Sequence, residues 1–303
     1  MRRWRPKPSI RVWAAVLVLL AVLVGVGVVG VGLGQILRGP PESWPVDLTV
    51  YARTLVLLGL LLLGGALAYR VGSALTLGYE LDRNGLYITW LGNRAVVPLE
   101  QIQRVDVGAH ASLPFALFRG LAYYYGQGQT TDGRRLHLFA TQPLAQCLVV
   151  LTPEDAYAIS PADHESFVQD LEQRRNLGAT KPLASAFDPS RLFLYAFWND
   201  TTVRVMLLAA LAVNLLVFGI LATRYPALAP MVQMRFDAAG QAADLRPRHQ
   251  VLFLPLAAFG LSLLNMALGL LVYRRQQIGA RLLQGASVVV QLLFGIAAIT
   301  IIR

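Results

Sequence analysis

The chain has 303 residues, of which 55% are hydrophobic and only 15% are charged. Soluble domains usually carry about a quarter charged residues, so a purely soluble composition is excluded. The formal net charge is +10, but the basic residues flank long apolar runs and are not interleaved with stacking aromatics, which argues against nucleic-acid binding. A single cysteine, Cys147, excludes an internal disulfide and a C-x-x-C motif. Its apolar neighbours predict a buried strand thiol.

Five apolar runs are long enough to cross a bilayer. A helix rises about 1.5 Å per residue, so a hydrocarbon core of about 30 Å requires about 20 apolar residues. The first run is too long for a signal-peptide core. The second contains Arg53, which we expect to reach the head-group layer. The five predicted spans lie within residues 12–37, 48–69, 205–223, 251–273 and 282–302.

The basic residues predict how these spans are oriented. The amino terminus, residues 1–11, carries five basic residues and is expected in the cytoplasm by the positive-inside rule. Alternation along the chain then places residues 71–200 in the cytoplasm and the loop 224–249 outside. Four arginines in that outer loop work against this orientation.

Three amide side chains lie within the predicted spans, namely those of Asn214, Asn265 and Gln291. A buried amide usually forms a hydrogen bond across helices, worth roughly 0.5–2 kcal/mol. A substrate path is the alternative interpretation. We favour interhelical hydrogen bonds, because no Asp, Glu, Lys or His accompanies these amides.

The segment between the second and third spans has strand periodicity. Residues 80–90 read as a strand, an Asn-Gly turn and a second strand, and 108–133 as irregular. Ser160, Pro161 and Asp163 then predict a helix start. That helix carries apolar residues four apart on one face and ends near Arg175. Further strands are predicted at 95–98, 102–107, 135–139, 146–152 and 156–159.

Several motifs in this segment occur in a recognisable order. They are Tyr79-Glu80-Leu81, Gly85-Leu86, residues 97–102 (VPLEQI) and residues 152–161 (TPEDAYAISP). On these motifs the segment resembles the bacterial pleckstrin-homology-like (PH) domain of membrane proteins. With the five spans, the sequence predicts an α+β membrane protein with about five transmembrane helices. The seven strands and the helix that follows them are expected to form a PH-like β-barrel or sandwich capped by one carboxyl-terminal helix. Phosphoinositide binding is not inferred, since a fold does not carry its ligand.

The outer loop has a second, weaker resemblance. Residues 230–244 (PMVQMRFDAAGQAAD) are similar to an uncharacterised membrane module of SdpI-type immunity proteins. That module usually has a histidine before its aromatic–acidic pair, whereas Arg235 here precedes Phe236 and Asp237, with Gly240 following. The departure removes a titrating or metal-binding role, so we expect the turn from Asp237 to Gly240 to be the common feature.

The expected organisation has five parts along the chain. They are a basic cytoplasmic amino terminus (1–11), a two-helix membrane hairpin (12–72), the PH-like domain (73–176), a linker with an interfacial helix (177–202), and a three-helix membrane region (203–303) containing the outer loop 224–249.

No residues are spaced as a catalytic or cofactor-binding group. His110, His137, His164 and His249 are isolated in sequence, and no nucleophile elbow, phosphate loop or dinucleotide fingerprint is present. We expect His137 to face solvent from a strand and His164 to be solvated. The sequence predicts no enzyme activity, no cofactor, no metal ion and no small-molecule substrate.

Aromatic residues in the irregular segment form the candidate interaction surface. They are Phe115, Phe118, Tyr123, Tyr124 and Tyr125. The alternative is that this segment packs on the membrane or on the domain core.

Three arginines near predicted turns, Arg83, Arg134 and Arg135, are candidate contacts to anionic lipid head groups. Each such contact is worth about 1 kcal/mol. A solvated strand rim is the alternative, and we favour it.

Together these features predict a non-catalytic, multi-pass protein of the plasma membrane. Its cytoplasmic PH-like domain is expected to bind a protein partner or a second copy beside the lipid bilayer. The alternative is a membrane sensor or immunity-type protein that acts through the outer loop 224–249. A transporter would require a polar path that these spans scarcely offer.

Overall fold

The structure is a computed structural model, which describes residues 2–108, 111–112, 121–178, 180–188, 197–198, 200–236 and 242–302. The chain forms two compact units. The first contains residues 1–24 and 62–193, and the second contains 25–61 and 194–303. The first two helices each contribute to both units.

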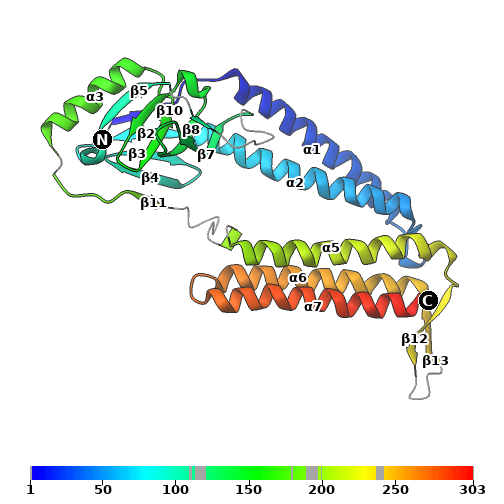
Figure 1. The fold of residues 1–303 in the computed structure, drawn as a ribbon. Helices are drawn as coiled ribbons and strands as arrows, with labels where there is room; N and C mark the ends of the chain where they lie inside the picture. Colours follow the sequence, from blue (N-terminus) through cyan, green and yellow to red (C-terminus); the bar gives the residue numbers. More distant parts are fainter. Residues whose placement is uncertain are drawn as a thin grey trace. The chain divides into compact units, whose positions relative to one another are not determined.

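Five of the described helices are long and apolar enough to cross a membrane (Figure 1). Their number agrees with the prediction. The second helix continues to Thr76, beyond its expected end at residue 69, because Val71 and Ala74 are buried in the core of the β domain. The five helices are α1 (Ile10–Ile36), α2 (Leu48–Thr76), α5 (Thr201–Arg224), α6 (Phe253–Val272) and α7 (Gln277–Ile301).

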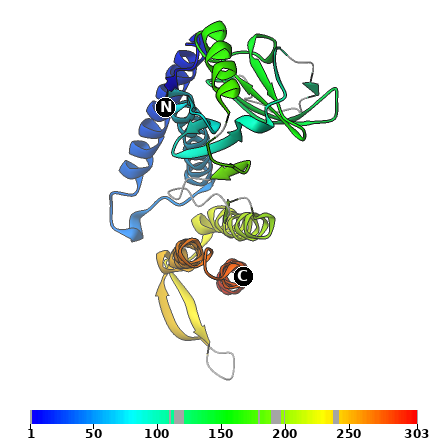
Figure 2. The same cartoon turned by 90° about the vertical axis from the view of Figure 1, so that its left-hand side faces the viewer.

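The β domain of the first unit consists of two sheets closed by a helix, α3 (His164–Leu177) (Figure 2). The first sheet has the order β1 (Arg2–Trp4), β2 (Gly78–Leu81), β3 (Gly85–Trp90), β4 (Asn93–Pro98) and β11 (Ala186–Asp188). The second has the order β5 (Arg104–Val107), β9 (Leu148–Leu151), β10 (Asp155–Ile159), β8 (Arg135–Ala140), β7 (Tyr124–Thr130) and β6 (Ala111–Ser112). Strands β8 and β10 are parallel, and the other described pairs are antiparallel.

The described part of the domain has more strands than the seven expected. Nine strands, β2 to β10, lie between Gly78 and Ile159. The segment 108–133, expected to be irregular, contains β6 and the seven-residue strand β7. Gly126 and Gly128 interrupt the alternation of β7 in the sequence, yet they pair in register with Leu138 and Leu136 of β8.

Segments outside the expected domain complete its first sheet. The strand β1 comes from the basic amino terminus and pairs with β2, while β11 comes from the predicted linker and pairs with β4. The linker 177–202 was expected to contain an interfacial helix, but its residues 186–188 form the strand β11. Residues 189–196 lie outside the described part.

The domain core lies between the sheets and under α3. Phe167 and Leu171 of α3 are fully buried there, as their spacing predicted. The residue that caps α3 is Asp163, whose side chain accepts a hydrogen bond from Ser166 N at 3.1 Å. Ser160, expected as a cap, is instead buried at the end of β10, where its amide donates to the hydroxyl of Tyr79.

In the second unit, the loop 224–249 forms a β-hairpin of β12 (Met231–Phe236) and β13 (Ala242–Pro247). Val232 is buried against apolar residues of α5 and α7. Short 3₁₀ helices occur in both units: η1 (Pro41–Ser43), η2 (Leu99–Gln101), η3 (Leu144–Gln146), η4 (Tyr225–Ala227) and η5 (Arg248–Leu252).

Candidate functional site

The β domain is joined directly to the end of α2. Only Leu77 separates α2 from β2, and its side chain is buried in the domain core. The hydroxyl of Thr76 accepts a hydrogen bond from Leu91 N at 2.9 Å, and the Leu91 side chain lies against Gly72. The turn between β3 and β4 therefore rests on α2, with no flexible linker between them.

The second attachment is the amino-terminal strap, which we define as residues 2–9. After β1, Lys7 N donates to Ser160 O at 2.8 Å, and the hydroxyl of Thr141 donates to Lys7 O at 2.6 Å. Gln142 Nε2 donates to Pro8 O at 3.1 Å. The strap thus crosses the ends of β8 and β10 before α1 begins at Ile10.

Both attachments lie at the same end of the domain, here called the helix end. Gly78 begins β2, Ala140 ends β8, and Ile159 ends β10. Tyr124, paired with Ala140, contacts the guanidinium of Arg11 through its hydroxyl and its ring. Because β2, β7 and β9 run away from this end and β3, β8 and β10 return to it, the turns at 82–84, 131–134 and 152–154 form the opposite end, here called the open end.

The structure separates the five aromatic residues of the candidate interaction surface. Tyr123 is 1% exposed and belongs to the core, so it is not part of an exposed contact surface. Tyr124 is partly buried against a separate apolar cluster on the outer face of the second sheet. Tyr125 lies in β7, but its side chain is outside the described part, as are Phe115 and Phe118.

The three arginines considered for lipid contact lie at the open end. Arg83 is exposed in the turn between β2 and β3, and Arg134 lies in the turn between β7 and β8. Arg135 forms an ion pair with Asp155 at 3.0 Å. Since α1 and α2 leave the domain at its other end, this placement does not favour contact of these arginines with the bilayer that those helices enter.

His137 is half-buried and does not face solvent as expected. Its ring stacks on Tyr157 at a centroid distance of 5.2 Å, and its Nε2 lies 3.2 Å from Asp155 Oδ1. The reason is that His137 shares the inward face of β8 with Phe139. Within the described residues, no three His, Cys, Asp or Glu side chains are grouped to hold a metal ion.

Two other titratable groups of the domain are shielded from solvent: Cys147 is buried, and His164, expected to be solvated, is partly buried. Burial raises the pKa of the Cys147 thiol to about 12, and this thiol donates to the carbonyl oxygens of Gln142 and Pro143. The predicted burial of the thiol is thus confirmed, although Cys147 directly precedes β9 and is not part of a strand. Burial, with the nearby Lys7 charge, lowers the pKa of His164.

The amides of the predicted spans join helices in the second unit, which confirms their expected structural role. Asn214 Nδ2 on α5 donates to Gln291 Oε1 on α7 at 2.8 Å. Gln291 Nε2 in turn donates to Ser262 Oγ on α6 at 2.9 Å. Asn265 of α6 donates to Ser287 Oγ of α7 at 3.1 Å.

One ion pair lies at the end of this helical bundle. Asp200 caps α5, accepting hydrogen bonds from Thr202 N and Val203 N. The same carboxylate accepts from Arg281 Nε at 2.8 Å and from the hydroxyl of Tyr273 at 2.9 Å. A single buried carboxylate therefore connects the beginnings of α5 and α7 with the end of α6.

The amino-terminal strap was not expected from the sequence. Its signal is Trp4, a lone aromatic among basic residues, which is 8% exposed and packs edge-on against Phe167 at 5.6 Å. Arg2 stacks on the same indole at 4.2 Å, and Arg3 lies 3.9 Å from Glu80. Basic residues that were assigned only to membrane orientation thus also hold the domain.

Comparison with known proteins agrees with the domain geometry. Residues 77–175 match the family model of the bacterial PH domain. The matched segment of this PH domain begins at Leu77 and ends within α3, so β1 and β11 are additions outside it. No curated protein and no solved structure matches the chain.

The PH domain match and the five apolar helices are the features of a membrane protein that carries a bacterial PH domain. The match does not extend to residues 230–244, so the similarity of that loop to SdpI-type immunity proteins stays a sequence prediction. Of its four residues, Asp237 and Gly240 lie outside the described part. Arg235 and Phe236 are described only as backbone of β12.

Proposed function

We propose that this protein is a non-catalytic platform of the plasma membrane, whose PH domain binds a protein partner or a second copy of the chain beside the bilayer. The observation that carries the proposal is the double attachment of the domain. The strap and the junction of α2 with β2 fix its helix end to two helices suited to a membrane. A domain held in this way presents its open end to the surrounding solution.

The open end has the mixed charge of a protein-binding surface. Arg83 and Asp132 are exposed on two turns of the open end, and the side chain of Glu154 is 84% exposed. Interspersed cations and anions suit another charged protein surface better than a uniformly anionic membrane. The basic strap, by contrast, lies at the helix end, where the positive-inside rule places it in the cytoplasm.

Photocrosslinking from defined positions tests this proposal. A photoreactive amino acid is placed in the full-length chain in its native membrane, at Arg83 and Asp132 of the open end. Gln173, exposed on α3, is the matched control position. We expect adducts of discrete mass from the open end, weakened by the charge reversals Arg83→Glu and Arg134→Glu.

Two outcomes would contradict the proposal. If adducts form equally from position 173, or are unchanged by charge reversal, the open end is not the surface that binds the partner. Cross-linking to lipid alone from residue 83 would support the alternative that this residue contacts lipid head groups.

A second candidate function is sensing through the loop 224–249, and it is favoured by the regular structure of the hairpin. Strands β12 and β13 pair, Val232 is buried, and the Arg248 guanidinium stacks on the ring of Tyr225 at 4.9 Å. We expect alanine replacement of residues 235–237 to abolish complementation of a deletion strain only if the hairpin is the receiver. Unchanged complementation would rule this alternative out.

A further inference from the structure

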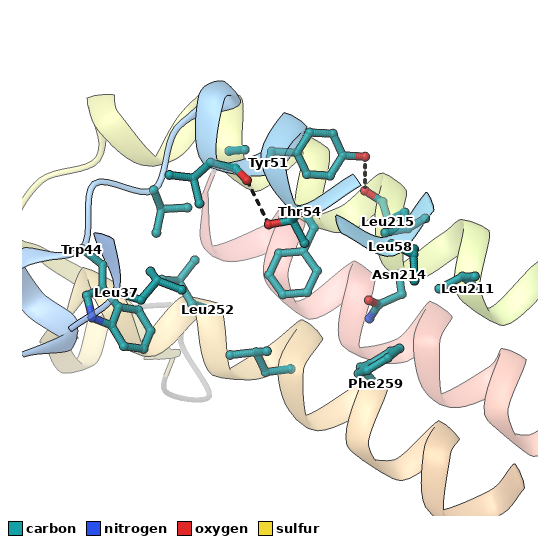
Figure 3. Close-up of a pocket in the computed structure, with 15 residues that line it drawn as sticks. Leu37, Trp44, Tyr51, Thr54, Leu58, Leu211, Asn214, Leu215, Leu252 and Phe259 are labelled. Atoms are coloured by element: carbon teal, nitrogen blue, oxygen red, sulfur yellow. Dashed lines mark hydrogen bonds between the residues drawn. The ribbon is translucent and has the colours of Figure 1, made fainter. Parts of the chain in front are cut away.

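A cavity of about 310 Å³ lies within the second unit, independent of the PH domain. Its walls come from the connection between α1 and α2, the first turns of α2, and facing parts of α5 and α6 (Figure 3). Trp44 lies in the connection, Leu58 on α2, Leu215 on α5, and Phe259 on α6. The volume is at the lower end of the range for small-molecule sites, about 300–1,000 Å³.

The lining is apolar and its few polar groups already donate hydrogen bonds. The hydroxyl of Tyr51 donates to Leu215 O at 2.9 Å, and that of Thr54 donates to Val50 O at 2.9 Å (Figure 3). Asn214 Nδ2 donates to Pro255 O and to Gln291. Among the described lining residues no side-chain donor is free, and a buried water needs two to four polar partners. The cavity therefore suits an apolar occupant.

The depth of the cavity matches one leaflet of a bilayer. Along α5 its lining runs from Ala222, near the end of the helix, to Leu211, near its middle. The eleven residue steps from Leu211 to Ala222 correspond to about 16 Å of helix, or about half of a hydrocarbon core of about 30 Å. Trp44 lies in the connection between α1 and α2, directly after η1, and tryptophan is enriched in the head-group layer.

We infer that this cavity binds one acyl chain of a membrane lipid, from the leaflet that contains the α1–α2 connection. The chain enters beside Trp44 and ends near Leu211 and Phe259. Helices α5, α6 and α7 of this unit all carry exposed apolar side chains, so in a bilayer an acyl chain is the apolar ligand present at the highest concentration. The occupant would hold the first turns of α2 against α5 at Tyr51.

Photolabelling in reconstituted bilayers tests this inference. The full chain is placed in phosphatidylethanolamine nanodiscs containing a phospholipid with a diazirine near the end of one acyl chain. We expect labels to concentrate between Leu211 and Ala222 of α5 and around Phe259 of α6. The substitution Leu215→Trp fills the cavity, and labelling at these positions should fall roughly tenfold, because a packed indole leaves no room for the chain.

The matched control is Leu216→Trp, since Leu216 is 64% exposed on the same helix and outside the cavity lining. Labelling should be unchanged in this variant. Leu58→Phe narrows the cavity from the opposite wall and should also reduce labelling. Labels spread evenly over the outward faces of α5, α6 and α7 in the unsubstituted protein would show annular lipid only and would overturn the inference. Equal labelling of the Leu215→Trp and Leu216→Trp variants would do the same.

Discussion

At the scale of single residues, two positions are important for the stability of the three-helix bundle formed by α5, α6 and α7. Gly269 of α6 faces Gln284 of α7, and a Cβ at residue 269 would lie 2.4 Å from Gln284 Nε2. That nitrogen donates to Asn265 O at 3.0 Å and is fully buried. A methyl group at residue 269 must therefore displace a buried, hydrogen-bonded amide.

We expect Gly269→Ala to destabilise the bundle by about 1–3 kcal/mol, the usual cost of overpacking. Gly260→Ala is the control in the same helix, because nothing lies within 4 Å of its Cβ position. That substitution should be neutral or stabilising by up to about 1 kcal/mol. Thermal unfolding in detergent measures both, and equal effects would disprove the close approach at Gly269.

Asp200 is the second of these residues, and its ionisation makes the stability of the bundle depend on pH. The guanidinium of Arg281 holds the pKa of Asp200 below its usual value, and the hydroxyl of Tyr273 adds to this effect. A carboxylate whose folded pKa is depressed stabilises the fold above its unfolded pKa, about 3.9. The stabilisation is lost as pH falls through the lower folded value.

We therefore expect the unfolding temperature of the bundle to fall when the pH is lowered from about 6 to about 3. In Asp200→Asn the protein should be less stable at neutral pH, and its loss of stability on acidification should be smaller. Parallel pH profiles for the two proteins would contradict this assignment.

At the scale of elements, the amino-terminal strap is part of the folded PH domain. Trp4 is buried against Phe167, although it lies far outside the matched segment 77–175. A domain cut at the boundaries of the match lacks both edge strands of its first sheet, β1 and β11, and part of its core. The free energy of unfolding of the PH domain should therefore depend on residue 4.

We expect Trp4→Ala to destabilise the PH domain by about 3–5 kcal/mol, as large-to-small core substitutions do. Trp13→Ala is the matched control, because Trp13 lies on α1 and is 67% exposed. Hydrogen exchange of the β2 amides reports the difference. Unchanged protection of β2 in Trp4→Ala would show that the strap does not support the domain.

Elements with strong periodicity were predictable from the sequence, and short or glycine-rich ones were not. The spans and the hairpin of β2 and β3 follow from apolar length and from the Asn-Gly turn. The strand β1 has only three residues, two of them arginines, so no pattern distinguishes it from an orientation signal. In β7, two glycines remove the alternation that identifies a strand.

The candidate sites were less predictable, because a position along a strand does not reveal which end of the domain meets the membrane. Arg83, Arg134 and Arg135 were correctly expected near turns, but only the attachment of α1 and α2 shows that these turns form the open end. The burial of Tyr123 depends on tertiary packing that its neighbours in sequence do not reveal.

At the scale of the whole molecule, the orientation predicted from the sequence leaves the amino terminus and the PH domain in the cytoplasm and the hairpin of β12 and β13 outside. We expect a membrane-impermeant maleimide added outside the cell to label cysteines introduced at Glu42 and Leu245, but not at Gln127. The native Cys147 should stay unlabelled, because its thiol is buried and its pKa is raised. Outside labelling at Gln127 would exclude a cytoplasmic partner.

The pairing of β1 with β2 also has a consequence for biosynthesis. The first strand leaves the ribosome long before its partner, because α1 and α2 are translated between them. If α1 and α2 span a bilayer, the pairing of β1 with β2 can form only when the start of α1 and the end of α2 lie on the same side of that bilayer. A chain whose first helix is inserted in reverse cannot form this pair, so folding of the PH domain distinguishes correctly inserted chains from inverted ones.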